Sequence, residues 1–258
     1  MTGRPVVPAS GEQGGAPTGR VDSVLTVICA VAGAYVLTAL YSPSLWAGVV
    51  SVASSSVIPV IAAVSVMRRR PPMITPADRV TLLRVALIGM LTGALVLTAV
   101  GALPVRTWTV LILASLAAVL DAVDGWVARH AGRGTAAGAR LDGEADAAAL
   151  LVLSALLAMT VGWWVLLIGL MRYLFVAGSL FRRSWRRRLP YSGFRRVVAA
   201  CQATAVVVGL GPVVPIPVAG ALAATALAAL VLSFGRDILL LERVGRSAGS
   251  TPHGHWEA

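Results

Sequence analysis

This sequence has few charged residues, only two cysteines and no lysine. Of its 258 residues only 13% are charged and 57% are apolar, and the mean hydropathy is +0.83. Soluble domains carry about 25% charged residues, so a large soluble catalytic domain is excluded and a membrane protein is indicated. Lysine is missing altogether, which excludes a Walker P-loop and a Schiff-base enzyme. The two cysteines, Cys29 and Cys201, lie inside apolar runs, so neither a disulfide framework nor a structural zinc site is expected.

Apolar residues are abundant, and they form eight runs, each near the ~20 residues that a helix needs to cross a bilayer. The runs are 23–41, 45–67, 80–101, 107–128, 145–161, 163–181, 197–213 and 216–235. The sequence therefore predicts an all-α polytopic membrane protein with eight transmembrane helices. Residues 1–21, which are rich in Gly and Pro, and the polar residues 246–258 are expected to be flexible tails.

The basic residues are all arginines, 22 against 11 acidic residues, and they cluster at alternate ends of the predicted helices. Clusters lie before the first run and after the second, fourth, sixth and eighth, whereas the other loops contain only Arg106. Because basic loops stay on the cytoplasmic side, both termini are predicted to be cytoplasmic. This pattern accounts for the net charge of +11 without nucleic-acid binding. The absence of Lys and Asn suggests a GC-rich bacterial genome and hence a bacterial plasma membrane.

A basic, proline-containing break at 68–72 divides the predicted helices into two units. Residues 22–70 would form a hairpin of two apolar helices, without an acidic residue after Asp22. Residues 71–245 would contain the other six helices and the polar residues inside them. The purpose of the hairpin stays open, a scaffold or dimer contact being one reading.

Aspartates inside the fourth run and the segment after it are the candidate functional residues. An ionisable side chain within a membrane span costs ~2.5–3.5 kcal/mol, so it needs a reason. At ~100° per residue, Asp121 and Asp124 share one stripe of a helix. Asp142 and Asp146, four residues apart, share a stripe of the next helix. A tight loop between the two helices would bring all four carboxylates together.

Four carboxylates that face one another require positive counter-charge. Oxygen ligands from two helices suit Mg²⁺ or Mn²⁺ better than zinc or copper. A metal site that lies in the membrane and opens to the cytosol suits a substrate with a lipid tail and a phosphorylated head group. An intramembrane ion pair or a proton path is the competing interpretation of the same aspartates.

The spacing of these residues resembles the motif of the CDP-alcohol phosphatidyltransferase family at every fixed position. The matching residues are Asp121, Asp124, Gly125, Ala128, Arg129, Gly138, Asp142 and Asp146. A second stretch, Asp78-x2-Thr81-x2-Arg84, is similar to the family's Asn-x2-Thr-x2-Arg, with Asp78 where asparagine is usual. The resemblance covers roughly residues 71–245. It implies the family's six-helix core, preceded here by the additional hairpin.

The resemblance also implies roles for individual residues. The metal ligands would be Asp121, Asp124, Asp142 and Asp146, holding two Mg²⁺ or Mn²⁺ ions, and Asp146 would also be the general base. The nucleotide pocket would be lined by Gly125, Ala128, Arg129, Gly138 and Thr81. Arg172 in the sixth run and Arg195 and Arg196 at the start of the seventh are candidates to bind an acceptor phosphate.

The implied activity is phospholipid synthesis. A phosphatidyl group would move from CDP-diacylglycerol to the hydroxyl group of a small polar acceptor, with release of CMP. The many cytoplasmic arginines favour glycerol 3-phosphate or inositol phosphate as the acceptor. Two alternatives stay open: transfer of a phospho-alcohol from a CDP-alcohol to a lipid hydroxyl, and, in a different class, a cation transporter. Family members are commonly homodimers, so a homodimer is also expected.

Overall fold

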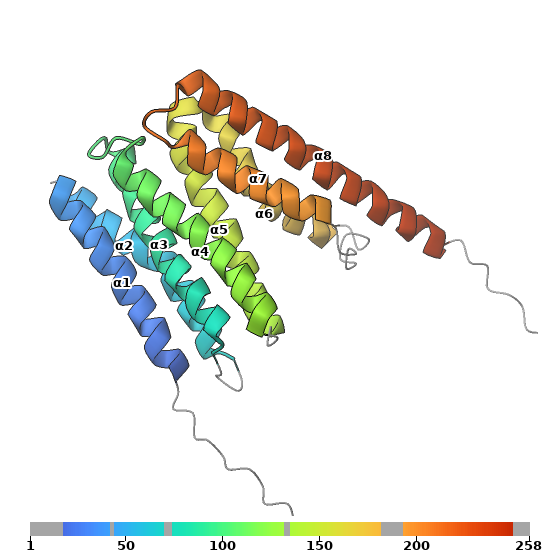
Figure 1. Ribbon diagram of the computed structural model, residues 1–258, viewed down its shortest axis with the longest axis horizontal. Helices are drawn as coiled ribbons and strands as arrows, with labels where there is room; N and C mark the ends of the chain where they lie inside the picture. Colours follow the sequence, from blue (N-terminus) through green and yellow to red (C-terminus); the bar gives the residue numbers. More distant parts are fainter. Residues whose placement is uncertain (1–17, 42–43, 70–73, 132–134, 182–192, 250–258) are drawn as a thin grey trace, which may run out of the picture.

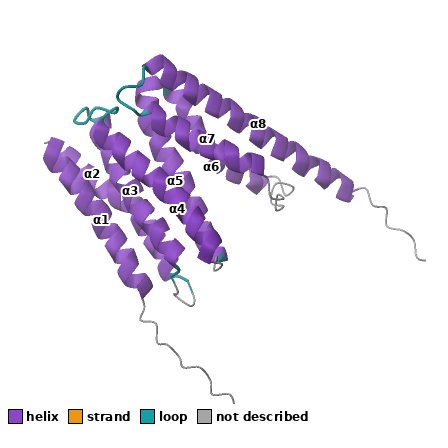
Figure 2. Ribbon diagram, in the orientation of Figure 1, coloured by secondary structure: helices purple, strands orange, loops and turns teal. Residues whose placement is uncertain are grey.

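The computed structural model describes residues 18–41, 44–69, 74–131, 135–181 and 193–249, and every regular element within them is helical (Figure 2). The side chains of residues 18, 126–131, 179–181, 194–196, 237 and 240–249 lie outside the description. The elements are α1 (Thr18–Tyr41), α2 (Leu45–Met67), α3 (Pro76–Ala99), α4 (Trp108–Ala131), α5 (Ala136–Val161), the 3₁₀ turn η1 (Trp163–Val165), α6 (Leu166–Phe181), α7 (Gly193–Gly209) and α8 (Ile216–Gly249).

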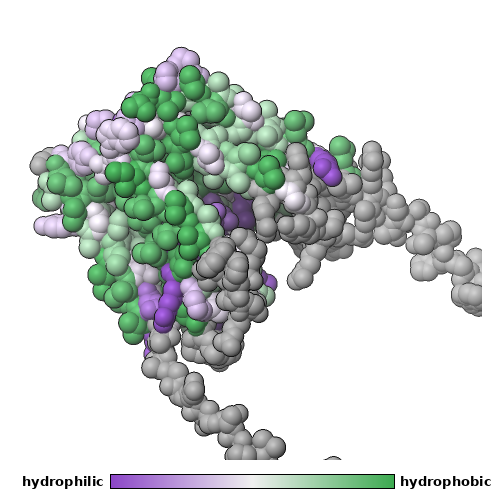
Figure 3. Space-filling model, in the orientation of Figure 1, coloured by the Kyte–Doolittle hydropathy of each residue, from purple (hydrophilic) through white to green (hydrophobic). Residues whose placement is uncertain are grey.

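The eight predicted helices are confirmed within the described residues. Six of them, α1 to α5 and α8, are long and apolar enough to cross a membrane, while α6 and α7 are shorter apolar helices. Consecutive helices run in alternating directions, so that α1 begins and α8 ends at the same end of the bundle (Figure 1). Hydrophobic side chains dominate the face drawn in Figure 3. This surface is the one that a lipid environment requires.

The start of α5 and the end of α8 differ most from the apolar runs. α5 begins at Ala136, ahead of the run that starts at 145, because Thr135 caps it: the Thr135 side chain accepts a hydrogen bond from the Gly138 amide at 3.0 Å. α8 continues beyond residue 235 to Gly249. Polar residues therefore extend both helices past their apolar parts, and the predicted stripe of Asp142 and Asp146 lies wholly on α5.

α3 is the central helix of the bundle. It packs against α1 and α2 on one side and α4 and α5 on the other. Within its most apolar stretch 67% of the residues are buried, against 22–44% in the other five long helices. Side chains on α3 can therefore contact the N-terminal hairpin as well as the rest of the bundle.

Small residues let the hairpin approach α3 closely. The Ser51 hydroxyl of α2 donates a hydrogen bond to the Gly93 carbonyl of α3 at 3.0 Å. A Cβ atom at Gly89 would lie only 2.5 Å from the Ser55 carbonyl oxygen and 2.9 Å from the Ala30 side chain. The two backbones are thus in direct contact, and any larger residue at 89 would push them apart.

Arg106, in the connection between α3 and α4, links this connection to the one between α7 and α8. Its guanidinium group donates hydrogen bonds to the carbonyl oxygens of Gly211 and Val214, between α7 and α8. This arginine therefore supplies side-chain donors to backbone carbonyls just past the end of α7.

Candidate functional site

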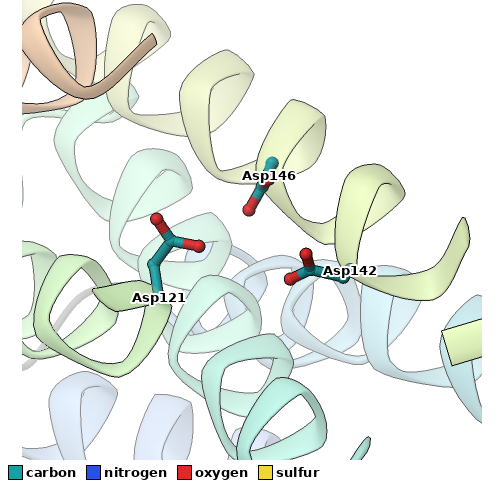
Figure 4. Close-up of side chains that lie close together, drawn as sticks. All are labelled: Asp121, Asp142 and Asp146. Atoms are coloured by element: carbon teal, nitrogen blue, oxygen red, sulfur yellow. The ribbon is translucent and has the colours of Figure 1, made fainter. Parts of the chain in front are cut away.

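Three of the four predicted aspartates meet where α4 faces α5. Asp121 comes from α4, and Asp142 and Asp146 come from successive turns of α5. Each offers one carboxylate oxygen, and these three atoms lie within 4.8 Å of one another. Figure 4 shows the three side chains pointing toward a common centre. The structure thus brings together residues from both stripes that the helical spacing predicted.

Arg84 of α3 lies beneath these carboxylates. Its side chain is 1% exposed, whereas those of the three aspartates are 43–52% exposed. Nη1 pairs with Asp121, and Nη2 lies 2.6 Å from Asp142 Oδ1 and 3.0 Å from Asp146 Oδ1. Since a buried guanidinium needs charged partners, one side chain of α3 fixes α4 and α5 relative to itself.

The fourth aspartate, Asp124, lies beside this group but is buried, with 4% of its surface exposed. The Thr81 hydroxyl of α3 donates a hydrogen bond to its Oδ2 atom. Thr81, which the resemblance assigns to the nucleotide pocket, therefore contacts a predicted metal ligand, and its role toward a nucleotide stays a prediction.

The chemistry of this donor set fits a hard divalent cation. Asp121, Asp142 and Asp146 supply oxygen atoms only, and this group contains no histidine or cysteine. Oxygen ligands of this kind are preferred by Mg²⁺ and Mn²⁺. Four carboxylates also carry more negative charge than the single guanidinium of Arg84 neutralises. The half-exposed carboxylate faces leave room for cations on the side away from Arg84.

Gly138, in the first turn of α5, lies against Asp78 at the start of α3. A Cβ atom at Gly138 would be 3.1 Å from Asp78 Oδ1 and 3.1 Å from Thr135 Oγ1. Asp78 Oδ2 accepts hydrogen bonds from the amide and the hydroxyl of Thr75, both at 2.9 Å. Asp78 Oδ1 pairs with Arg69 at 2.9 Å. The aspartate is thus accommodated, where the family has asparagine, by a capping box and an arginine from the hairpin.

The remaining residues predicted for the nucleotide pocket lie near the end of α4. Gly125 is half-buried and follows Asp124 directly. Ala128 and Arg129 belong to the last turns of α4, but their side chains lie outside the described part.

Of the predicted acceptor ligands, Arg172 is described and lies close to the carboxylates. It is exposed on α6, and a Cβ atom at Gly143 would lie 3.3 Å from its Nη2 atom. Its guanidinium group therefore rests on the α5 residue that follows Asp142. The side chains of Arg195 and Arg196, in the first turn of α7, lie outside the described residues.

Arg84 and Arg69 contact residues of the candidate site, although neither of them was assigned a role there from the sequence. Arg84 lies inside the predicted run 80–101, so the cost of an ionisable residue in a membrane span was a signal that could have identified it. The sequence offered no comparable indication for Arg69. It lies in a basic loop, and arginines are expected in any cytoplasmic loop of a membrane protein.

Comparison with protein-family models matches residues 74–234 to the family described as CDP-alcohol phosphatidyltransferase. The matched segment is more than half of the chain, begins just before α3 and ends within α8. The hairpin of α1 and α2 lies outside it. Searches of curated proteins and of solved structures find no match.

Proposed function

The chain belongs to the CDP-alcohol phosphatidyltransferase family, whose members are membrane transferases of substituted phosphate groups. On that premise we propose that it moves a phosphatidyl group from CDP-diacylglycerol to the hydroxyl group of a small polar acceptor. The other product is CMP. The observation that carries the proposal is the meeting of Asp121, Asp142 and Asp146 above Arg84, in helices of the family-matched segment. The apolar helices around this cluster suit a lipid-linked donor.

Four aspartates, Asp121, Asp124, Asp142 and Asp146, are the proposed ligands of two Mg²⁺ or Mn²⁺ ions. When bound, such ions neutralise the negative charge of a diphosphate and favour attack at phosphorus. Support comes from the oxygen-only donor set, from its open side and from the excess of negative charge around Arg84. Arg84 itself holds the carboxylates of α4 and α5 at a fixed separation.

Asp146 is the proposed general base. Its carboxylate is 45% exposed and is held 3.0 Å from Arg84, so it has both a fixed position and an open face. It takes the proton of the acceptor hydroxyl, whose oxygen then forms a bond to the phosphorus that carries diacylglycerol. The bond from that phosphorus to the bridging oxygen breaks, and CMP leaves with this oxygen.

The proposed nucleotide pocket comprises Gly125, Ala128, Arg129, Gly138 and Thr81. The small residues among them, Gly125, Ala128 and Gly138, let a nucleotide approach the helix backbone. Gly138 supports this proposal, since it lies at the start of α5, one turn before Asp142.

For the acceptor we propose a phosphorylated alcohol, glycerol 3-phosphate or inositol phosphate. Support comes from Arg172, an exposed arginine whose guanidinium group lies against Gly143, next to the carboxylate cluster. A guanidinium group pairs with phosphate in bidentate fashion. Arg195 and Arg196 are proposed to assist. The arginine distribution supports a cytoplasmic location of both termini, and the absence of Lys and Asn supports a bacterial plasma membrane.

The deciding experiment incubates membranes that contain the protein with labelled CDP-diacylglycerol and each acceptor separately. We expect CMP release that requires both a divalent cation and one acceptor. Asp146→Asn should lower kcat by at least about 100-fold, the usual contribution of a general base, and leave CMP binding largely intact. Asp22→Asn, in a surface ion pair with Arg79, is the matched control and should behave like wild type.

Other outcomes decide between the alternatives. Wild-type turnover of Asp146→Asn would contradict the role of that residue as base. Product formed only from a CDP-linked alcohol and a lipid hydroxyl would favour the alternative reaction, transfer of a phospho-alcohol from a CDP-alcohol to the lipid. Cation flux in vesicles without CMP release would favour a transporter.

A further inference from the structure

The N-terminal hairpin lies outside the family-matched segment, yet Arg69, the second residue after α2, reaches the start of α5. Arg69 Nη1 donates a hydrogen bond to Asp78 Oδ1 at 2.9 Å. Arg69 Nη2 donates to the carbonyl oxygen of Ala137 at 3.2 Å. Ala137 immediately precedes Gly138. A single guanidinium group therefore bridges the first turn of α3 and the first turn of α5.

The Arg69–Asp78 part of this bridge is a largely buried ion pair, whereas the hydrogen bond to the Ala137 carbonyl is exposed. The exposed fraction is 10% for the Arg69 side chain and 2% for that of Asp78. The second oxygen of Asp78 is occupied by Thr75. Removal of one partner from such a pair strands an uncompensated charge, so its geometry matters far more than that of an exposed pair. Arg79 and Asp22 form an exposed pair of the same kind between α3 and α1, with 57% and 25% exposure.

The bridge lies next to residues of the candidate site. Asp78 Oδ1, the atom that Arg69 holds, is the nearest neighbour of Gly138, 3.1 Å from where a Cβ atom would be. One turn further along α3 is Thr81, and one turn further along α5 is Asp142. The two helices are therefore joined twice, by Arg69 at their first turns and by Arg84 at the carboxylates.

We infer that Arg69 is a positioning residue for the nucleotide part of the donor site. Through Asp78 and the Ala137 carbonyl it sets the separation of α3 and α5 at Gly138, which a cytidine diphosphate must contact. The inference rests on the proposed function, since it takes the nucleotide to bind beside Gly138. It also gives the hairpin a part in donor binding, because Arg69 is the second residue after the end of α2 and that helix is packed on α3.

The test measures kinetics with CDP-diacylglycerol as the varied substrate and glycerol 3-phosphate in excess. Arg69→Gln should raise KM for the donor by about tenfold, as expected for the loss of a charged hydrogen bond that orders a binding site, with kcat changed less than about twofold. Arg69→Gln combined with Asp78→Asn should restore KM, because the buried charge is gone and the two amides can pair. Arg79→Gln is the matched control and should leave both constants unchanged.

Two results would overturn the inference: a wild-type KM for Arg69→Gln, or equal impairment of the single and the double variant. If Arg69→Gln does not accumulate in membranes, Arg69→Lys takes its place, since lysine keeps the charge but lacks the fork that spans both partners. A raised KM then supports the inference and an unchanged one overturns it. Should wild type release no CMP from CDP-diacylglycerol, the proposed function fails, and calorimetric titration of these variants with CMP still tests the positioning role.

Discussion

At the scale of single residues, Arg84 determines how the carboxylates are arranged. Its guanidinium group contacts Asp121, Asp142 and Asp146 and is almost fully buried. Carboxylates this close repel one another, and one fixed cation beneath them reduces that repulsion without occupying their exposed side. The same side chain ties three helices together. Arg84 is therefore expected to stabilise the fold as well as the site.

Arg84→Gln should lower the free energy of unfolding by about 3 kcal/mol, since it leaves three carboxylates without their buried partner. Because those carboxylates then carry more uncompensated charge, added Mg²⁺ should raise the melting temperature of the variant more than that of wild type. Thermal unfolding in detergent, with and without Mg²⁺, measures both effects. Equal Mg²⁺ shifts in the two proteins would contradict the prediction. Arg79→Gln serves as the control for loss of a surface arginine.

At the scale of helices, the small-residue contact between α2 and α3 is a close approach of the hairpin to the family-matched segment. Gly89 and Gly93 of α3 lie directly against the backbone of α2. Lipid gives helices little hydrophobic reason to associate, so such contacts are what holds them together. The position of α3, and with it Arg84 and Thr81, depends on this packing.

Gly89→Ala should destabilise the protein by about 1–3 kcal/mol, as overpacking does, because its Cβ atom would lie 2.5 Å from a backbone oxygen that cannot move alone. Gly235→Ala on α8 is the matched control, since a Cβ atom there would have no neighbour within 4 Å. Melting temperatures of the two variants in the same detergent give the comparison. Alanine favours a helix more than glycine does, so a drop of the same size in both variants would contradict the contact as the cause.

Helices and the aspartate stripes could be predicted from the sequence because both depend on local spacing. The length of each apolar run gives a span, and Asp142 and Asp146 lie one turn apart in any helix. The contacts of Arg69 and Gly89 could not be predicted from the sequence, since each joins segments that are far apart in the chain. Arg69 and Ala137, for example, are 68 residues apart. The start of α5 depends similarly on a cap and on packing against Asp78, neither of which raises local hydropathy.

At the scale of the whole molecule, the hairpin and the family-matched helices form one packed bundle. α3 has neighbours on both sides, and Tyr41 at the end of α1 is hydrogen-bonded to Thr109 of α4 at 2.9 Å. Removal of α1 and α2 would expose one side of the most buried helix. The hairpin is thus part of the environment of the site.

Deletion of residues 1–67 should therefore lower both the melting temperature and the rate of CMP release, although Arg69 is retained. The expected cause is loss of the contacts of Ser51 and Ser55 with α3, after which Arg84 is less firmly placed. Deletion of residues 1–17, which precede α1, is the control and should change neither quantity. Full activity of the longer deletion would instead make the hairpin a dispensable scaffold.

The burial of Arg84 also has a consequence for biosynthesis. Ribosomes make Arg84 before its partners, 37 residues ahead of Asp121, so α3 enters the bilayer while its cation is still uncompensated. Arg84 lies in the first half of α3, and an arginine at the centre of a membrane span costs ~2.5–3.5 kcal/mol to insert. The already inserted α1 and α2 offer the nascent α3 a surface of small and hydroxyl-bearing side chains to pack on. Because the hairpin is synthesised first, it can hold α3 in the bilayer until the aspartates that pair with Arg84 have been synthesised.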